Sequence, residues 1–323
     1  MHGWVIGYAK PTSFLDMQWS DQVGMYLGVC FDTTNLQNGQ NTISLNGLAA
    51  KVRAWHGRTI PLGNRAFVCN TVFFPAVWYA AQVMPCLPAD VNRVHRFFAT
   101  FIWESRFERM RRSNLFLSLA KGGLGLVNVE VKLKVQRYLF FRRQNRPLML
   151  NSFAKLGCGF LRDWLEDAGV GPKSRVLKFY RELEQAVRFF EERFSRDYLM
   201  EVKRKSLYWD TIDMLFPAPL YRSRMECTLV SDVLKRLPRL PVKVAVKDFF
   251  IRFHVEVLPV KPWLANKGFF VPWSTNCDLC PYPESLQHVF LFCTNAAHFW
   301  HEVRSAFGIS LYPTWKDVKF LTS

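Results

Sequence analysis

The chain has 323 residues, of which 50% are hydrophobic, so it can form a real core, and its length suggests about two folded units. Its formal net charge of +17 favours a polyanionic partner, most commonly nucleic acid, although a generic basic surface would give the same total. No secretory signal opens the sequence, and five of the eight cysteines (Cys30, Cys69, Cys86, Cys158 and Cys227) lie far apart, which favours free thiols in an intracellular protein, cytoplasmic and/or nuclear.

The front of the chain is mixed in composition and turns helical after residue 45. The run VGMYLGVCF (23–31) is β-like, and TTNLQNGQN (33–41) is typical of a loop. Helical periodicity then predicts three helices over 46–57, 62–84 and 88–105, separated by prolines. The third helix is expected to bury one face, made of Val91, Val94, Phe98, Phe101, Ile102 and Ser105.

Residues 66–87 carry no charge and are the one stretch that resembles a membrane span. Asn70, Gln82, Pro75 and Pro85 interrupt this stretch, and basic segments flank it. A buried helix or helix pair is therefore the expected structure, with a membrane helix as the rival interpretation.

The positive charge is concentrated in the middle of the chain. Residues 91–146 hold 13 Lys and Arg against three Glu, whereas the last 64 residues carry a net charge of only +1. Trp103 and Phe107 can stack on bases, but such residues more often belong to a core. In the rival interpretation, the arginines near 104–112 pair with Glu104 and Glu108 on a solvated turn. The candidate phosphate contacts are Arg93, Arg96, Arg106, Arg109, Arg111, Arg112, Lys132, Arg137, Arg142 and Arg143.

The remaining segments up to residue 258 are also helical in pattern. The glycines of KGGLGLVNV (121–129) suit a tight turn but lack the spacing of a dinucleotide-binding loop. Helices are predicted over 129–145, 175–203, 222–236 and 244–257. The clearest is 175–203, whose apolar stripe consists of Val176, Tyr180, Leu183, Val187, Phe190, Phe194 and Tyr198. The expected fold is mainly α, with a small β-containing part at the front and a metal-held module at the back.

Four residues of the types that bind metals, three Cys and one His, cluster in CDLCPYPESLQHVFLFC, which has the spacing C-x2-C-x7-H-x4-C. A closed set of thiolates and imidazole suits structural Zn²⁺, and it leaves no open position for a reactive water. The predicted zinc ligands are Cys277, Cys280, His288 and Cys293. The rival interpretations are a redox Cys-x-x-Cys with an unrelated His and Cys nearby, or a substitute ligand from His298 or His301.

Several motifs in order resemble the C-terminal part of non-LTR (LINE-type) retrotransposon reverse transcriptases, downstream of the catalytic core. They are YLGV (26–29), the segment 51–88 that ends in Leu-Pro, FFATFIWES (97–105) followed by GGLGL (122–126), and the CCHC spacing of 277–293. The resemblance covers nearly the whole chain. It implies a remnant of the palm and post-palm strand region at 1–45, a basic thumb-like helical domain at 46–150, a helical linker at 151–258 and a CCHC zinc knuckle at 259–323.

The chain departs from that family in its catalytic residues. The polymerase needs carboxylates that hold two Mg²⁺ ions, supplied in the family by a Phe/Tyr-x-Asp-Asp strand, and this sequence has no adjacent Asp pair. That strand is expected to lie before Met1, and neither nuclease type of the family is evident. The resemblance implies a non-catalytic fragment that binds RNA and/or DNA and partners the upstream reverse transcriptase core, with no membrane association.

Two other functions compete with this one. In the first, zinc stabilises a helical interaction or scaffold domain that does not bind nucleic acid. The nearly neutral net charge of the last 60 or so residues favours this function for that part of the chain. In the second, the chain is an intact enzyme of unknown kind, which would need a pair of carboxylates in a cleft.

Overall fold

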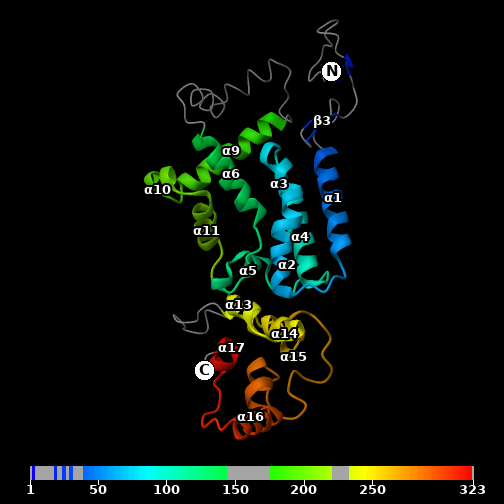
Figure 1. Cartoon of the computed structure of the whole chain (residues 1–323), viewed down its shortest axis with the longest axis vertical. Helices are drawn as coiled ribbons and strands as arrows, with labels where there is room; N and C mark the ends of the chain where they lie inside the picture. The colour runs from blue at the N-terminus through cyan, green and yellow to red at the C-terminus, as the bar shows by residue number, and fades with distance from the viewer. Residues whose placement is uncertain are drawn as a thin grey trace. The chain divides into compact units, whose positions relative to one another are not determined.

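The computed structural model describes residues 2–3, 18–19, 24–26, 29–31, 39–143, 175–219 and 233–321, and within them the protein is mainly helical, as predicted (Figure 1). The chain divides into two compact units. The first unit comprises residues 1–58, 68–105 and 127–215, and the second comprises 59–67, 106–126 and 216–323. The chain therefore crosses between the units several times.

Two pairs of short strands precede the helices. β1 (His2–Gly3) pairs in parallel with β2 (Gln18–Trp19), and β3 (Gly24–Tyr26) pairs antiparallel with β4 (Val29–Phe31). The β-like run at 23–31 thus contains a strand pair. Of the predicted loop at 33–41, residues 33–38 lie outside the described part, and the rest belongs to the first helix.

The helices of the first unit form two main packing groups. In one, α1 lies against both α3 and α4 (Figure 1); in the other, α6 lies against α9 and α11. Between α2 and α3 the chain continues as the wider helix η1. The bounds are α1 (Gly39–Trp55), η1 (Cys69–Phe73), α3 (Phe74–Val83), α4 (Pro88–Trp103), α6 (Val129–Arg143), α9 (Arg175–Glu191), α10 (Arg196–Glu201) and α11 (Arg204–Leu215).

The predicted buried face of α4 is confirmed for its helical members, since Val91, Val94, Phe98, Phe101 and Ile102 are all buried. Each such side chain contributes about 1.5–3 kcal/mol of apolar burial. Pro88 sits in the first turn, where a missing N–H costs nothing. The uncharged stretch 66–87 contains buried residues of η1 and α3. Among the described helices, none combines the length and the apolarity that crossing a bilayer requires.

The predicted helix at 175–203 is two helices. It breaks after Glu191 and restarts at Arg196, where the Ser195 side chain accepts a hydrogen bond from the backbone N–H of Tyr198. Serine at this position satisfies an N–H that the new helix leaves unpaired, so it favours a restart over a continuous helix. Leu183 and Phe190 are buried, in agreement with the predicted stripe.

The Gly-rich segment forms the tight turn that its sequence predicts. Gly122 and Gly125 have φ values of 82° and 66°, which side chains rarely adopt. At Gly123 a Cβ atom would lie 2.1 Å from the carbonyl oxygen of Leu117, so only glycine fits there.

The second unit is built from short helices around an aromatic core. Phe253 of α14 contacts Phe290 of η4 and Trp315 of α17, with ring centroids 4.7 Å and 5.3 Å apart. This core anchors η4, which carries one end of the metal-ligand motif. The bounds are α2 (Leu62–Val68, whose last residue falls in the first unit), α5 (Arg112–Phe116), η2 (Leu119–Lys121), α13 (Val233–Arg236), η3 (Leu237–Arg239), α14 (Val244–His254), α15 (Lys261–Asn266), η4 (His288–Phe292), α16 (Thr294–Phe307) and α17 (Trp315–Phe320). Of the predicted helix at 222–236, only 233–236 lies within the described residues.

Candidate metal centre

A short hairpin at Thr275–Glu284 presents the first two cysteines. The Cys277 N–H donates to the Tyr282 carbonyl at 2.8 Å, and the Glu284 N–H donates to the Thr275 carbonyl at 2.9 Å. Inside the hairpin, the Leu279 N–H donates to Cys277 Sγ at 3.5 Å. The hairpin therefore turns both thiols of the Cys-x-x-Cys step toward one point.

A single turn of wide helix presents the other two residues. The π-helix η4 runs from His288 to Phe292, and the Cys293 N–H donates to the His288 carbonyl at 2.7 Å. This hydrogen bond spans five residues, so one π turn brings the His288 and Cys293 side chains together. Cys293 is also the N-cap residue of α16, where the chain leaves the π turn. One turn of π-helix therefore connects these two residues.

The four side chains converge to the size of a metal coordination shell. Their ligand atoms all lie within 4.8 Å of one another. The Sγ atom of Cys293 is 3.8 Å from that of Cys277 and 4.0 Å from that of Cys280. A tetrahedron with metal–sulfur bonds of about 2.3 Å has sulfurs about 3.8 Å apart, so the observed spacing fits a bound ion.

His288 supplies a second, independent indication of a metal site. The residue is buried, and its Nε2 atom has no hydrogen-bond partner among the described residues. A buried polar nitrogen without a partner costs free energy, and a metal ion at the centre of the cluster would satisfy it. The Cys3His cluster can therefore hold a metal ion.

The surroundings favour the thiolate form of Cys280, whereas the pKa of Cys293 is raised, because a backbone hydrogen bond from Asn295 that lowers it is outweighed by burial and the neighbouring thiols. The Thr294 hydroxyl lies 3.4 Å from Cys280 Sγ, and hydrogen bonds from the Thr294 hydroxyl and backbone N–H lower the pKa of Cys280. Lys261 lies beside the hairpin, and its hydrogen bond with Asp278 raises the pKa of the Lys261 ammonium. Both effects add positive character around the sulfurs.

The rival interpretations of the motif fit less well. A redox Cys-x-x-Cys would leave His288 and Cys293 unrelated, whereas here both converge on the same point. His298 and His301 are exposed on α16 and do not belong to the cluster.

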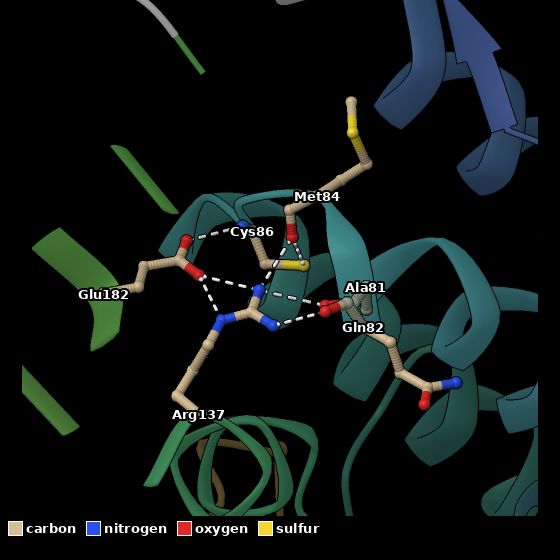
Figure 2. A network of polar contacts seen from close by, with 6 residues as sticks. All are labelled: Ala81, Gln82, Met84, Cys86, Arg137 and Glu182. Carbon is tan, nitrogen blue, oxygen red and sulfur yellow. Dashed lines mark hydrogen bonds and ion pairs between the residues drawn. The ribbon is translucent and has the colours of Figure 1, made fainter. Parts of the chain in front are cut away.

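Arg137, predicted to contact phosphates, is instead an interior residue. Figure 2 shows its guanidinium enclosed by Glu182 of α9 and by the chain at the end of α3. Its Nη atoms donate to the carbonyls of Ala81, Gln82 and Met84 at 2.7–3.0 Å, and Nε and Nη2 contact Glu182. With 2% of its side chain exposed, Arg137 lies in the interior of the first unit, where a phosphate cannot reach it.

Three other predicted contacts are also engaged within the protein. Arg142 donates to the carbonyls of Leu199, Met200 and Val202. Arg112 pairs with Glu108, as the rival interpretation of that turn expects. The Lys132 ammonium lies 4.4 Å from the centroid of the Phe74 ring, and burial lowers its pKa.

The remaining candidates are more available to a ligand. Arg93, Arg96, Arg106, Arg111 and Arg143 are exposed, and Arg93 also lies 3.8 Å from the Asp90 carboxylate. Arg109 is partly buried, and this burial together with the charge of Arg252 lowers the pKa of Arg109. Arg93, Arg96 and Arg143 belong to the first unit, and Arg106, Arg109 and Arg111 to the second.

Of the two aromatic candidates, one belongs to the interior and the other is half-buried. Trp103 is buried, and Phe107 packs against Trp263 and Phe269. Trp103 therefore has the core role that was the alternative to base stacking, and Phe107 is a half-buried member of an aromatic cluster.

Sequence reasoning missed the neighbours of the metal ligands. Thr294 directly follows the ligand Cys293, so the sequence alone could have placed its hydroxyl near the metal cluster. Lys261 lies 16 residues before Cys277, and no spacing rule connects the two.

Comparisons with known proteins add no identification. No protein-family model matches the chain. No curated protein matches it in sequence either.

Proposed function

We propose that the Cys3His cluster binds one Zn²⁺ ion and that the protein uses it for structure rather than catalysis. The observation that carries this proposal is the convergence of three thiols and the buried His288 imidazole, whose Nε2 has no hydrogen-bond partner among the described residues, to tetrahedral spacing. Such a donor set suits zinc, and four protein ligands leave no position for a reactive water. The ion would supply folding free energy to the hairpin, η4 and the start of α16.

We further propose that the chain is a non-catalytic nucleic-acid-binding segment of a LINE-type reverse transcriptase, acting on RNA and/or DNA beside the polymerase core. Its support is the resemblance of the motifs, the net charge of +17 and the arginines that remain exposed. Arg93 and Arg96 lie three residues apart on α4, opposite its buried face, where they can follow a phosphate backbone. Such contacts give affinity rather than sequence preference.

An interaction or scaffold domain stabilised by zinc is the second candidate. One observation favours it: the second unit has an apolar groove of about 340 Å³ lined by Phe249, Phe290, Trp300 and Leu321 among others. Phe270 and Trp273 near the metal hairpin are also almost fully exposed. Exposed apolar surface of this kind marks contacts with other proteins.

Binding of labelled RNA and duplex DNA across a salt series separates the two candidates. A nucleic-acid-binding segment should bind both with weak sequence dependence and a steep salt dependence. Each lost phosphate contact reduces the slope of log K against log salt by about 0.9 on duplex DNA and about 0.7 on single strands. Arg93→Ala with Arg96→Ala should therefore lower the duplex slope by up to about 1.8.

The matched control is Arg181→Ala with Arg188→Ala on α9. These two exposed arginines lie outside the basic segment, and Arg188 pairs with Glu184. The control removes the same charge and should leave the slope unchanged. No binding by the zinc-loaded wild type, or equal slopes in the two double variants, would reject the proposal and favour the scaffold.

A further inference from the structure

Lys261, the first residue of α15, contacts the two residues of the hairpin that flank the metal ligand Cys277. Its Nζ donates to the Asn276 carbonyl at 3.0 Å and forms an ion pair with the Asp278 carboxylate. Asn276 and Asp278 are the residues immediately before and after Cys277. One side chain therefore fixes the backbone that aims the Cys277 thiol.

The same lysine also fixes the far strand of the hairpin. The Lys261 backbone N–H donates to Glu284 Oε1 at 3.1 Å, and Glu284 Oε2 lies 3.7 Å from Lys261 Nζ. Glu284 closes the hairpin through its own N–H bond to Thr275. Lys261 is thus a common point for both strands.

Lys261 is itself held in place by the core of the second unit. Val260, the preceding residue, packs against the buried cluster that contains Phe253. Pro262 follows, with its restricted φ. Only 20% of the Lys261 side chain is exposed. The ammonium therefore occupies a defined position rather than sampling solvent.

The charge of this ammonium suits a loaded cluster. Three thiolates and a neutral imidazole around a divalent ion leave a formal charge of about −1, which burial makes costly unless a cation is near. The Lys261 ammonium pairs with Asp278 and Glu284 on the flank of the Cys277 loop, where it offsets part of the carboxylate charge that would otherwise add to that of the cluster.

We propose that Lys261 is a positioning residue of the metal centre, one that holds the Cys277 loop in ligating geometry and offsets the carboxylate charge beside the loaded cluster. This inference rests on the proposed metal binding. Residues that orient metal ligands in this way typically change metal affinity by about 10–100-fold when they are replaced.

The test compares Lys261→Met, Lys261→Arg and Lys267→Met in the full chain. Methionine keeps the length of the side chain and removes its charge and donors. Lys267, just past the end of α15, is exposed and lies 5.8 Å from the ring centroids of Phe107 and Trp263. Its replacement makes the same change in net charge away from the hairpin. Zn²⁺ affinity is measured by chelator competition, and Co²⁺ absorption reports the coordination geometry.

Lys261→Met should bind Zn²⁺ at least about tenfold more weakly than Lys267→Met and release it faster, with one ion per chain in both. Lys261→Arg should lie between Lys261→Met and the wild type. The tetrahedral Co²⁺ spectrum and the helical circular dichroism should persist in all saturated variants. If Lys261→Met fails to fold, Lys261→Gln and Lys267→Gln replace the two methionine variants, and equal affinities in that pair would overturn the role.

Equal affinities in Lys261→Met and Lys267→Met would overturn the role of Lys261. An arginine variant as tight as the wild type would support it, and an arginine variant as weak as methionine would overturn it. A wild type that binds neither Zn²⁺ nor Co²⁺ would instead refute the metal centre itself, so the two failures are distinguishable.

Discussion

Replacing Arg137 by methionine should be among the most destabilising single changes in the first unit. Methionine keeps much of the volume but leaves Glu182 without its cation and the carbonyls of Ala81, Gln82 and Met84 without their donor (Figure 2). Breaking one side of a buried pair costs about 3–5 kcal/mol. At about 2–4 °C per kcal/mol for a unit of this size, Tm should fall by about 6–20 °C.

The control for this change lies on the same helix as Glu182. Arg188 pairs with Glu184 on the exposed side of α9, and Arg188→Met should cost about 0–1 kcal/mol. Urea unfolding followed by circular dichroism, with hydrogen exchange of α3, α6 and α9, measures both variants. If Arg137→Met costs no more than Arg188→Met, the buried network does not stabilise the unit and the reasoning is wrong.

The pH dependence of the same variant gives an independent check. Burial raises the pKa of Glu182, and the charge of Arg137 opposes that rise. Without Arg137, the pKa of Glu182 in the folded state should rise further above its unfolded value. A raised pKa of Glu182 in the folded state adds to the free energy of unfolding. This contribution is fully present below the pKa of Glu182 in the unfolded chain, and it is lost as pH rises through the pKa in the folded state. The deficit of Arg137→Met should therefore be smaller near pH 4 than near pH 8.

Two further predictions concern the metal centre and the chemistry. Cys280→Ser should abolish stoichiometric metal binding and speed hydrogen exchange in 275–307, because the ion contributes folding free energy there. The control is Cys86→Ser, which replaces a half-buried thiol outside the cluster and should change neither property. A Cys280→Ser variant with full zinc content would contradict the assignment. The isolated chain should show no primer extension with Mg²⁺ or Mn²⁺, because it has no adjacent Asp pair; template-dependent incorporation by highly purified protein would refute this.

Features set by local spacing could be predicted from the sequence. The metal ligands lie within 17 residues, so a hairpin and one helical turn are enough to bring them together. The buried face of α4 follows from apolar residues at intervals of three and four, and the turn at 121–129 follows from its glycines. In each case the residues that interact are close in the sequence.

Features set by distant contacts could not be predicted. Arg137 was expected on the surface because arginine usually is, but its partners lie 45 to 56 residues away. Helix α6 is buried at Val131, Leu133, Val135 and Leu139, since α3, α4, α9 and α11 all contact it, so its sequence shows no clean stripe. The restart at Arg196 depended on one serine within a continuous apolar pattern.

The most direct test of the metal centre is the metal content and ligand set of the reduced, folded chain. Elemental analysis of purified protein should give about one zinc per chain, and X-ray absorption should show three sulfur ligands at about 2.3 Å and one nitrogen at about 2.0–2.1 Å. A folded, reduced protein that contains no zinc and takes up none, or a bound ion with a different ligand set, would contradict the account.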